Sequence, residues 1–220
     1  MLGQMQNHPL LISSVIDFAA RHQGDTEVVS RRVEGDIHRY TWADVQRRAK
    51  QVAKALDALG VKVGERVGTL AWNGYRHLEL YFGVSGSGRV LHTVNPRLLP
   101  EQIAWIVNHA EDTHIFFDIN LLPIIQKIHG ICPSVRRYVM FTEDGFVPKD
   151  HGVPNLVAYE SFIAGKSRDV VWGNFPEKTA AGLCYTSGTT GNPKGVLYSH
   201  RSNLLHTLIT LQKDSLGLGV

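Results

Sequence analysis

Residues 186–195 gather the side chains in this chain that are best suited to chemistry. The segment reads T-S-G-T-T-G-N-P-K-G and holds four hydroxyl side chains, three glycines and one lysine. Glycine lets backbone N–H groups come close to a polyanion, hydroxyls donate hydrogen bonds, and lysine supplies a mobile positive charge. Few ligands other than phosphate need all three together, so the pattern predicts a phosphate-binding loop.

The segments on either side would hold the two ends of this loop. Apolar runs at residues 181–185 and 196–198 are typical of short strands. The loop is not a Walker A motif, which requires glycine directly before the lysine and serine or threonine directly after it, whereas Lys194 lies between Pro193 and Gly195. This disfavours a P-loop kinase or GTPase. A solvated turn between two strands is the alternative without a ligand.

The pattern T-S-G-T-T-G-N-P-K-G-V resembles the phosphate loop of the adenylate-forming superfamily, which comprises acyl-CoA synthetases, adenylation domains of peptide synthetases and beetle luciferases. In that family the loop closes over the β- and γ-phosphates of ATP, and a carboxylic acid attacks the α-phosphate to give an acyl-adenylate and pyrophosphate. In the CoA ligases a thiol then displaces AMP. The nucleophile is the substrate carboxylate, so the loop would position the triphosphate and neutralise its charge.

The resemblance also implies a role for individual residues of the loop. Thr186 would place its hydroxyl near Mg²⁺, and no residue of this portion would be catalytic. The residues that it implies in ATP binding are Thr186, Ser187, Gly188, Thr189, Thr190, Gly191 and Lys194.

Upstream segments extend the resemblance over essentially the whole chain. Residues 60–67, 71–77, 94–98 and 101–105 are most similar to medium-chain acyl-CoA synthetases and to 3-methylmercaptopropionyl-CoA ligases, which activate methylthiopropionate. The resemblance therefore implies an ATP-dependent carboxylate–CoA ligase that uses ATP, Mg²⁺ and CoA. Its substrates would be short- or medium-chain or methylthio-substituted acids.

Members of the superfamily are more than twice as long as this chain of 220 residues. The sites for adenine, ribose and the acyl chain, and the carboxy-terminal lid domain with its catalytic lysine, are implied to follow residue 220. We therefore expect an amino-terminal portion that is inactive alone. Homodimers are common in the family, although nothing in the spacing of these residues shows one.

Two other functions stay open at this point. An NTPase or kinase that used the loop for phosphoryl transfer would leave ADP rather than release pyrophosphate. A non-catalytic module would bind nucleotide or another phosphate ligand and give no carboxylate-dependent product.

Composition narrows the class of protein. The chain is 43% hydrophobic and 9% aromatic, as globular proteins are, and its net charge of +3 comes from scattered basic residues, so no nucleic-acid partner is expected. Three arginine pairs, at residues 31–32, 47–48 and 136–137, are predicted to lie on solvated faces. Two cysteines, no signal peptide and no apolar stretch of about 18 residues indicate a cytoplasmic protein without a membrane span. Eleven histidines show no metal-binding spacing.

Hydrophobic spacing predicts an α/β fold with a layered, mainly parallel sheet and flanking helices. Helices are predicted to end near residue 24, to run from 42 to 59 behind a Thr41 cap, and to span 75–86, 100–110 and 121–129; strands are predicted at 28–33 and 37–40 as a hairpin, and at 66–72, 90–94, 114–117 and 137–141.

The end of the chain is predicted to start a second unit. Three prolines and several glycines in residues 142–178 indicate long connections. We expect residues 1–175 to form an amino-terminal α/β subdomain and residues 176–220 to begin a nucleotide-binding subdomain. Its phosphate loop, residues 186–195, would open a second, incomplete sheet followed by a helix from Arg201. Such a sheet would leave an unpaired edge at residues 181–185.

Overall fold

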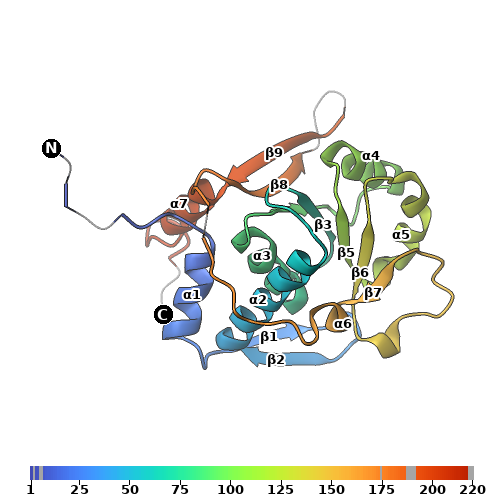
Figure 1. The fold of residues 1–220 in the computed structure, drawn as a ribbon, viewed down its shortest axis with the longest axis horizontal. Helices are drawn as coiled ribbons and strands as arrows, with labels where there is room; N and C mark the ends of the chain where they lie inside the picture. The colour runs from blue at the N-terminus through green and yellow to red at the C-terminus, as the bar shows by residue number, and fades with distance from the viewer. Residues whose placement is uncertain (2, 5–6, 174, 187–191, 218–220) are drawn as a thin grey trace.

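The computed structural model describes residues 1, 3–4, 7–173, 175–186 and 192–217. Its helices are α1 (Ser13–His22), α2 (Trp42–Ala58), α3 (Tyr75–Gly86), α4 (Pro100–Ala110), α5 (Leu122–Ile128), α6 (Tyr159–Ile163) and α7 (His200–Thr210) (Figure 1). Its strands are β1 (Glu27–Arg31), β2 (Ile37–Thr41), β3 (Arg66–Leu70), β4 (Val90–Thr93), β5 (His114–Asp118), β6 (Arg137–Phe141), β7 (Leu156–Ala158), β8 (Ala180–Thr186) and β9 (Lys194–Ser199).

Seven of these strands form one sheet in the order β7-β6-β5-β3-β4-β8-β9. All neighbours run parallel except β8 and β9, and β1 and β2 form a separate antiparallel hairpin. The predicted α/β class with a mainly parallel sheet and the predicted hairpin are confirmed.

Helices cover both faces of this sheet, which is what a parallel sheet with buried strands requires. On one face α4 and α5 pack through residues such as Ile103, Ile106 and Ile125. On the other face α2, α3 and α6 pack through residues such as Leu56 and Leu80 (Figure 1). The interior strand β5, which lies between β6 and β3, is therefore buried along its whole length.

The predicted start of α2 is confirmed in detail. The Thr41 hydroxyl accepts a hydrogen bond from the Asp44 backbone N–H at 3.3 Å, and the Asp44 carboxylate accepts one from the Thr41 N–H at 3.2 Å. Together they form a capping box. After the helix, Gly60 adopts a φ of +70°, which glycine tolerates best.

The predicted second sheet is wrong within the described part of the chain. Strand β8 joins the first sheet instead, because it pairs in parallel with β4 through Leu91 and Gly182, His92 and Leu183, and Thr93 and Cys184. Its residues 182–184 therefore have a strand on each side, β4 on one and β9 on the other, so the unpaired edge that was predicted around them is also wrong. Burial of Ala181 and Leu183 against the existing core favours this placement. The predicted division between residues 175 and 176 stays a prediction.

The prediction of long connections over residues 142–178 missed two short elements. Strand β7 extends the sheet beside β6, and α6 follows it directly and buries Tyr159, Phe162 and Ile163. With three and five residues, these elements are too short to show a clear hydrophobic period.

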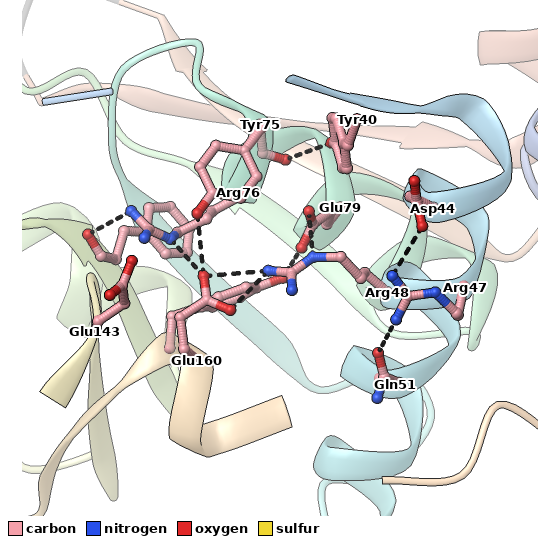
Figure 2. Close-up of polar contacts among 12 residues, drawn as sticks. Tyr40, Asp44, Arg47, Arg48, Gln51, Tyr75, Arg76, Glu79, Glu143 and Glu160 are labelled. Atoms are coloured by element: carbon pink, nitrogen blue, oxygen red, sulfur yellow. Dashed lines mark hydrogen bonds and ion pairs between the residues drawn. The ribbon is translucent and has the colours of Figure 1, made fainter. Parts of the chain in front are cut away.

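Two arginines that were predicted to be solvated are largely buried. The side chains of Arg32 and Arg48 are 11% and 16% exposed. Figure 2 shows Arg48 between Glu79 of α3, at 2.7 Å, and Glu160 of α6, at 2.9 Å. The prediction that the arginine pairs lie on solvated faces is therefore wrong for Arg32 and Arg48. Carboxylates from distant parts of the chain pair with both of these side chains.

Glu160 is the centre of this buried ionic network. It accepts hydrogen bonds from Arg48, from Arg76 Nε at 2.9 Å and from the Tyr75 hydroxyl at 3.1 Å (Figure 2). Arg76 also donates to Glu34, in the turn between β1 and β2, at 2.8 Å. The network therefore ties α2, α3, α6 and the hairpin together.

No helix in the described part of the chain has the length and apolar character needed to span a bilayer.

Candidate phosphate-binding site at the end of strand β8

The predicted phosphate loop is the connection between the antiparallel strands β8 and β9. Thr186 ends β8 and pairs directly with Lys194, the first residue of β9. Both side chains are exposed. The structure thus brings together two of the predicted residues, a hydroxyl and an ammonium group, at the mouth of the loop. The other predicted residues, Ser187, Gly188, Thr189, Thr190 and Gly191, lie outside the described residues.

Strand β8 is fixed to the rest of the fold at several points. The buried Ser85 hydroxyl on α3 donates a hydrogen bond to the Ala181 carbonyl oxygen at 2.8 Å. Thr93 Oγ1 of β4 lies 3.2 Å from Cys184 Sγ. Because β3, β4 and β8 run parallel, their carboxyl ends meet at one edge of the sheet, where ligands of open α/β sheets bind.

Tyr185, just before the loop, links β8 to α4. Its hydroxyl lies 2.6 Å from His109 Nδ1, and the His109 ring stacks on Trp105 with ring centroids 4.8 Å apart. This contact was not predicted from the sequence. Residue type alone gave no signal for it, since the two residues are 76 positions apart.

A cavity of about 720 Å³ lies beside these strand ends. Thr69, Thr93 and Cys184 occupy matching positions on the three adjacent strands β3, β4 and β8, and all three line it. Thr69 is 1% exposed, and its hydroxyl has no hydrogen-bond partner among the described residues. The other lining residues come mainly from α3, the β1 strand and the loops after β3 and β4, and most of the surface is apolar. Its size is that of a small-molecule site.

The donor chemistry at the mouth of the loop suits phosphate better than a protein-held metal. Lys194 provides an ammonium group and Thr186 a hydroxyl, the two side-chain types that contact phosphate oxygens. Within the described ranges there is no group of three or more His, Cys, Asp or Glu side chains that could hold a metal ion. In nucleotide sites Mg²⁺ keeps several waters and binds the substrate phosphates, and a Ser or Thr hydroxyl of a phosphate loop can be one of its ligands, so the Thr186 hydroxyl fits such an ion.

A comparison with protein-family models decides the family. The model described as AMP-binding enzyme matches residues 16–218. The chain belongs to the AMP-binding enzyme family. This confirms the superfamily that the loop and the upstream segments indicated.

Two relatives with 46% identity to this chain are named as CoA ligases. The chain is 46% identical over 218 residues to the medium-chain-fatty-acid–CoA ligase of Ectopseudomonas oleovorans, a match that covers 99% of this chain and 40% of that enzyme. It is also 46% identical over 220 residues to the 3-methylmercaptopropionyl-CoA ligase of Ruegeria lacuscaerulensis, with the same coverage of both chains. This AMP-binding enzyme chain therefore spans about 40% of the length of these relatives.

Solved structures share the fold of this AMP-binding enzyme. Acetoacetyl-CoA synthetase from Streptomyces lividans superimposes with a TM-score of 0.80 over 91% of this chain and 32% of that one, at 20% identity. The likeness supports the observed arrangement of helices around the sheet.

Proposed function

We propose that this chain is part of an ATP-dependent carboxylate–CoA ligase. The enzyme would form an acyl-adenylate and pyrophosphate and then transfer the acyl group to CoA. The observation that carries the proposal is 46% identity, along nearly the whole chain, to two relatives that are both named CoA ligases. Their names support medium-chain or methylthio-substituted acids as substrates.

The proposed roles follow from the chemistry of the loop ends. An oxygen of the substrate carboxylate attacks the α-phosphorus of ATP, and the bond to the bridging oxygen of pyrophosphate breaks. Lys194 would neutralise charge on the β- and γ-phosphates as pyrophosphate leaves, and Thr186 would hold its hydroxyl near Mg²⁺. The remaining residues proposed to contact phosphate are Ser187, Gly188, Thr189, Thr190 and Gly191.

Both loop ends are fixed to the sheet, which suits a role in positioning rather than covalent chemistry. We further propose that residues 176–220 begin the nucleotide-binding part and that residues 1–175 support it. The homodimer and the cytoplasmic location stay predictions.

Isotope transfer tests the proposal at the level of bonds. The complete gene product is supplied with ATP, Mg²⁺, CoA and an acid labelled with ¹⁸O in its carboxylate. Attack at the α-phosphorus followed by thiol attack on the acyl carbon leaves one ¹⁸O in AMP. Unlabelled AMP, or ADP in its place, would contradict the proposal.

A further inference from the structure

The mouth of the phosphate loop lies at the edge of the sheet that β9 forms. Strand β9 is the last in the strand order, and Lys194 on it is exposed. Among the described strands β9 pairs only with β8, and this pairing places Lys194 opposite Thr186. A short two-stranded extension of this kind is poorly constrained sideways unless side chains fix it.

Tyr185 provides such a contact on the residue next to Thr186. Its ring lies across Gly195, its partner in the hairpin register, so closely that a Cβ atom at Gly195 would be 3.2 Å from Tyr185 Cζ. Gly195 therefore makes room for the Tyr185 ring, and the ring in turn covers the glycine, which has no side chain. The Tyr185 ring of β8 thus packs against β9 at the pair next to Thr186 and Lys194.

The other end of Tyr185 is held by a rigid helix. The Tyr185 hydroxyl is 2.6 Å from His109 Nδ1, and the stack on Trp105 orients the His109 ring. Helix α4, which carries both residues, is locked into the core by side chains such as Ile106 and Val107, each 1% exposed. The contact therefore connects the hairpin to a helix that is packed into the core.

We propose that Tyr185 and His109 are positioning residues, which hold Thr186 and Lys194 in the place where they receive the triphosphate of ATP. The inference rests on the proposed function, because it needs ATP at the loop. Neither side chain touches the reacting atoms. Their effect is to keep the hydroxyl and the ammonium group in place before ATP arrives, so that binding does not have to order them.

The test uses the complete gene product and two matched substitutions. Tyr185→Phe removes only the hydroxyl, and His109→Phe removes the hydrogen-bonding ring atoms while it keeps an aromatic ring to stack on Trp105. Tyr198→Phe is the control, since it makes the same change at an exposed residue of the same hairpin. The measurements are the dissociation constant of Mg-ATP and the rates of two steps, adenylate formation and thioester formation from isolated acyl-adenylate.

We expect Tyr185→Phe and His109→Phe each to weaken Mg-ATP binding about three- to tenfold, the range that one hydrogen bond supports. The double variant should be no weaker than either single one, because both changes remove the same bond. Thioester formation from isolated acyl-adenylate should stay at the wild-type rate, as should every property of Tyr198→Phe.

Two results would overturn the inference while the proposed function stands. One is Tyr185→Phe binding Mg-ATP as tightly as Tyr198→Phe. The other is an equal slowing of both steps, which is the mark of a general loss of folded protein. If the unchanged protein instead gave no carboxylate-dependent pyrophosphate, the proposed function itself would fail and the inference with it.

Discussion

Replacing Glu160 by glutamine tests whether the buried ionic network holds the helical layer together. Glu160 accepts hydrogen bonds from Arg48, Arg76 and Tyr75, and its side chain is 27% exposed. Glutamine has nearly the same shape, keeps one acceptor oxygen and removes the negative charge. The change therefore isolates charge from volume.

The size of the expected loss follows from what the two arginines keep. Breaking a buried ion pair typically costs about 3–5 kcal/mol, because a charge is left uncompensated. Here Arg48 keeps Glu79 at 2.7 Å and Arg76 keeps Glu34 at 2.8 Å, and water reaches part of Glu160. We therefore expect a loss of about 2–3 kcal/mol in the free energy of unfolding, or about 4–12 °C in Tm for a chain of this size.

Urea unfolding at pH 7, with Glu143→Gln as the control, measures this loss. Glu143 also pairs with an arginine, Arg32, at 2.9 Å, and Arg32 reaches Glu34 of the network at 3.4 Å, but the Glu143 side chain is 50% exposed. Exposed pairs contribute about 0–1 kcal/mol, so the control should stay close to wild type. If Glu160→Gln lost no more stability than Glu143→Gln, the network would not hold the layer as argued.

Acid provides a second check on the same variant. Burial acts to raise the pKa of Glu160, but Arg48 and Arg76 lower it by more, so the net pKa lies below its usual value. A carboxylate with a lowered pKa in the folded state stabilises the protein at pH values above its ordinary, unfolded-state pKa. This stability is lost as the pH falls through the folded-state pKa. The gap between wild type and Glu160→Gln should therefore shrink in acid, and a constant gap would contradict the sign of the shift.

Three further changes test other parts of the structure. Gly83→Ala would place a Cβ atom 2.7 Å from the Ala49 carbonyl oxygen, so we expect it to lower the free energy of unfolding by about 1–3 kcal/mol although alanine has the better helix propensity. The control is Gly130→Ala, whose Cβ atom would meet open space and which should stay within about 0.5 kcal/mol of wild type. If both substitutions lowered the free energy of unfolding equally, the packing argument would be refuted. Lys194→Ala should slow adenylate formation more than thioester formation from isolated acyl-adenylate, because pyrophosphate has left before the thiol attacks, and equal slowing would count against its role. Burial lowers the pKa of His114 to about 4, so its neutral ring contributes stability that is lost as the pH falls from about 6.5 toward 4. In urea unfolding, the difference in free energy of unfolding between wild type and His114→Gln should therefore shrink between pH 7 and pH 5. An unchanged difference would contradict this prediction.

Local patterns predicted the regular elements of the fold well. Thr41 and the apolar spacing behind it predict α2, because a cap and a helical period are properties of neighbouring residues. Short elements such as α6 show too few residues for a period to appear. The strand β8 was predicted, but the sheet that it joins was not. Its partner β4 lies about 90 residues earlier in the chain, and no local sequence pattern indicates pairing over that distance.

The site was predictable in its chemistry but not in its supports. The order of hydroxyls, glycines and lysine in the loop indicated phosphate, and in the structure Thr186 pairs with Lys194 across the hairpin. The link from Tyr185 to His109 and the carboxylate partners of Arg48 depend on tertiary packing. Charged residues that are buried in pairs have the same spacing as solvated ones, so the sequence favours the commoner solvated case.

The most direct test of the central claim is the nucleotide product of the complete gene product with ATP and Mg²⁺. Short, medium-chain and methylthio-substituted carboxylic acids are each supplied with and without CoA. We expect pyrophosphate that depends on the acid, together with AMP and a thioester when CoA is present. ADP formed without any dependence on the acid would contradict it and favour an NTPase.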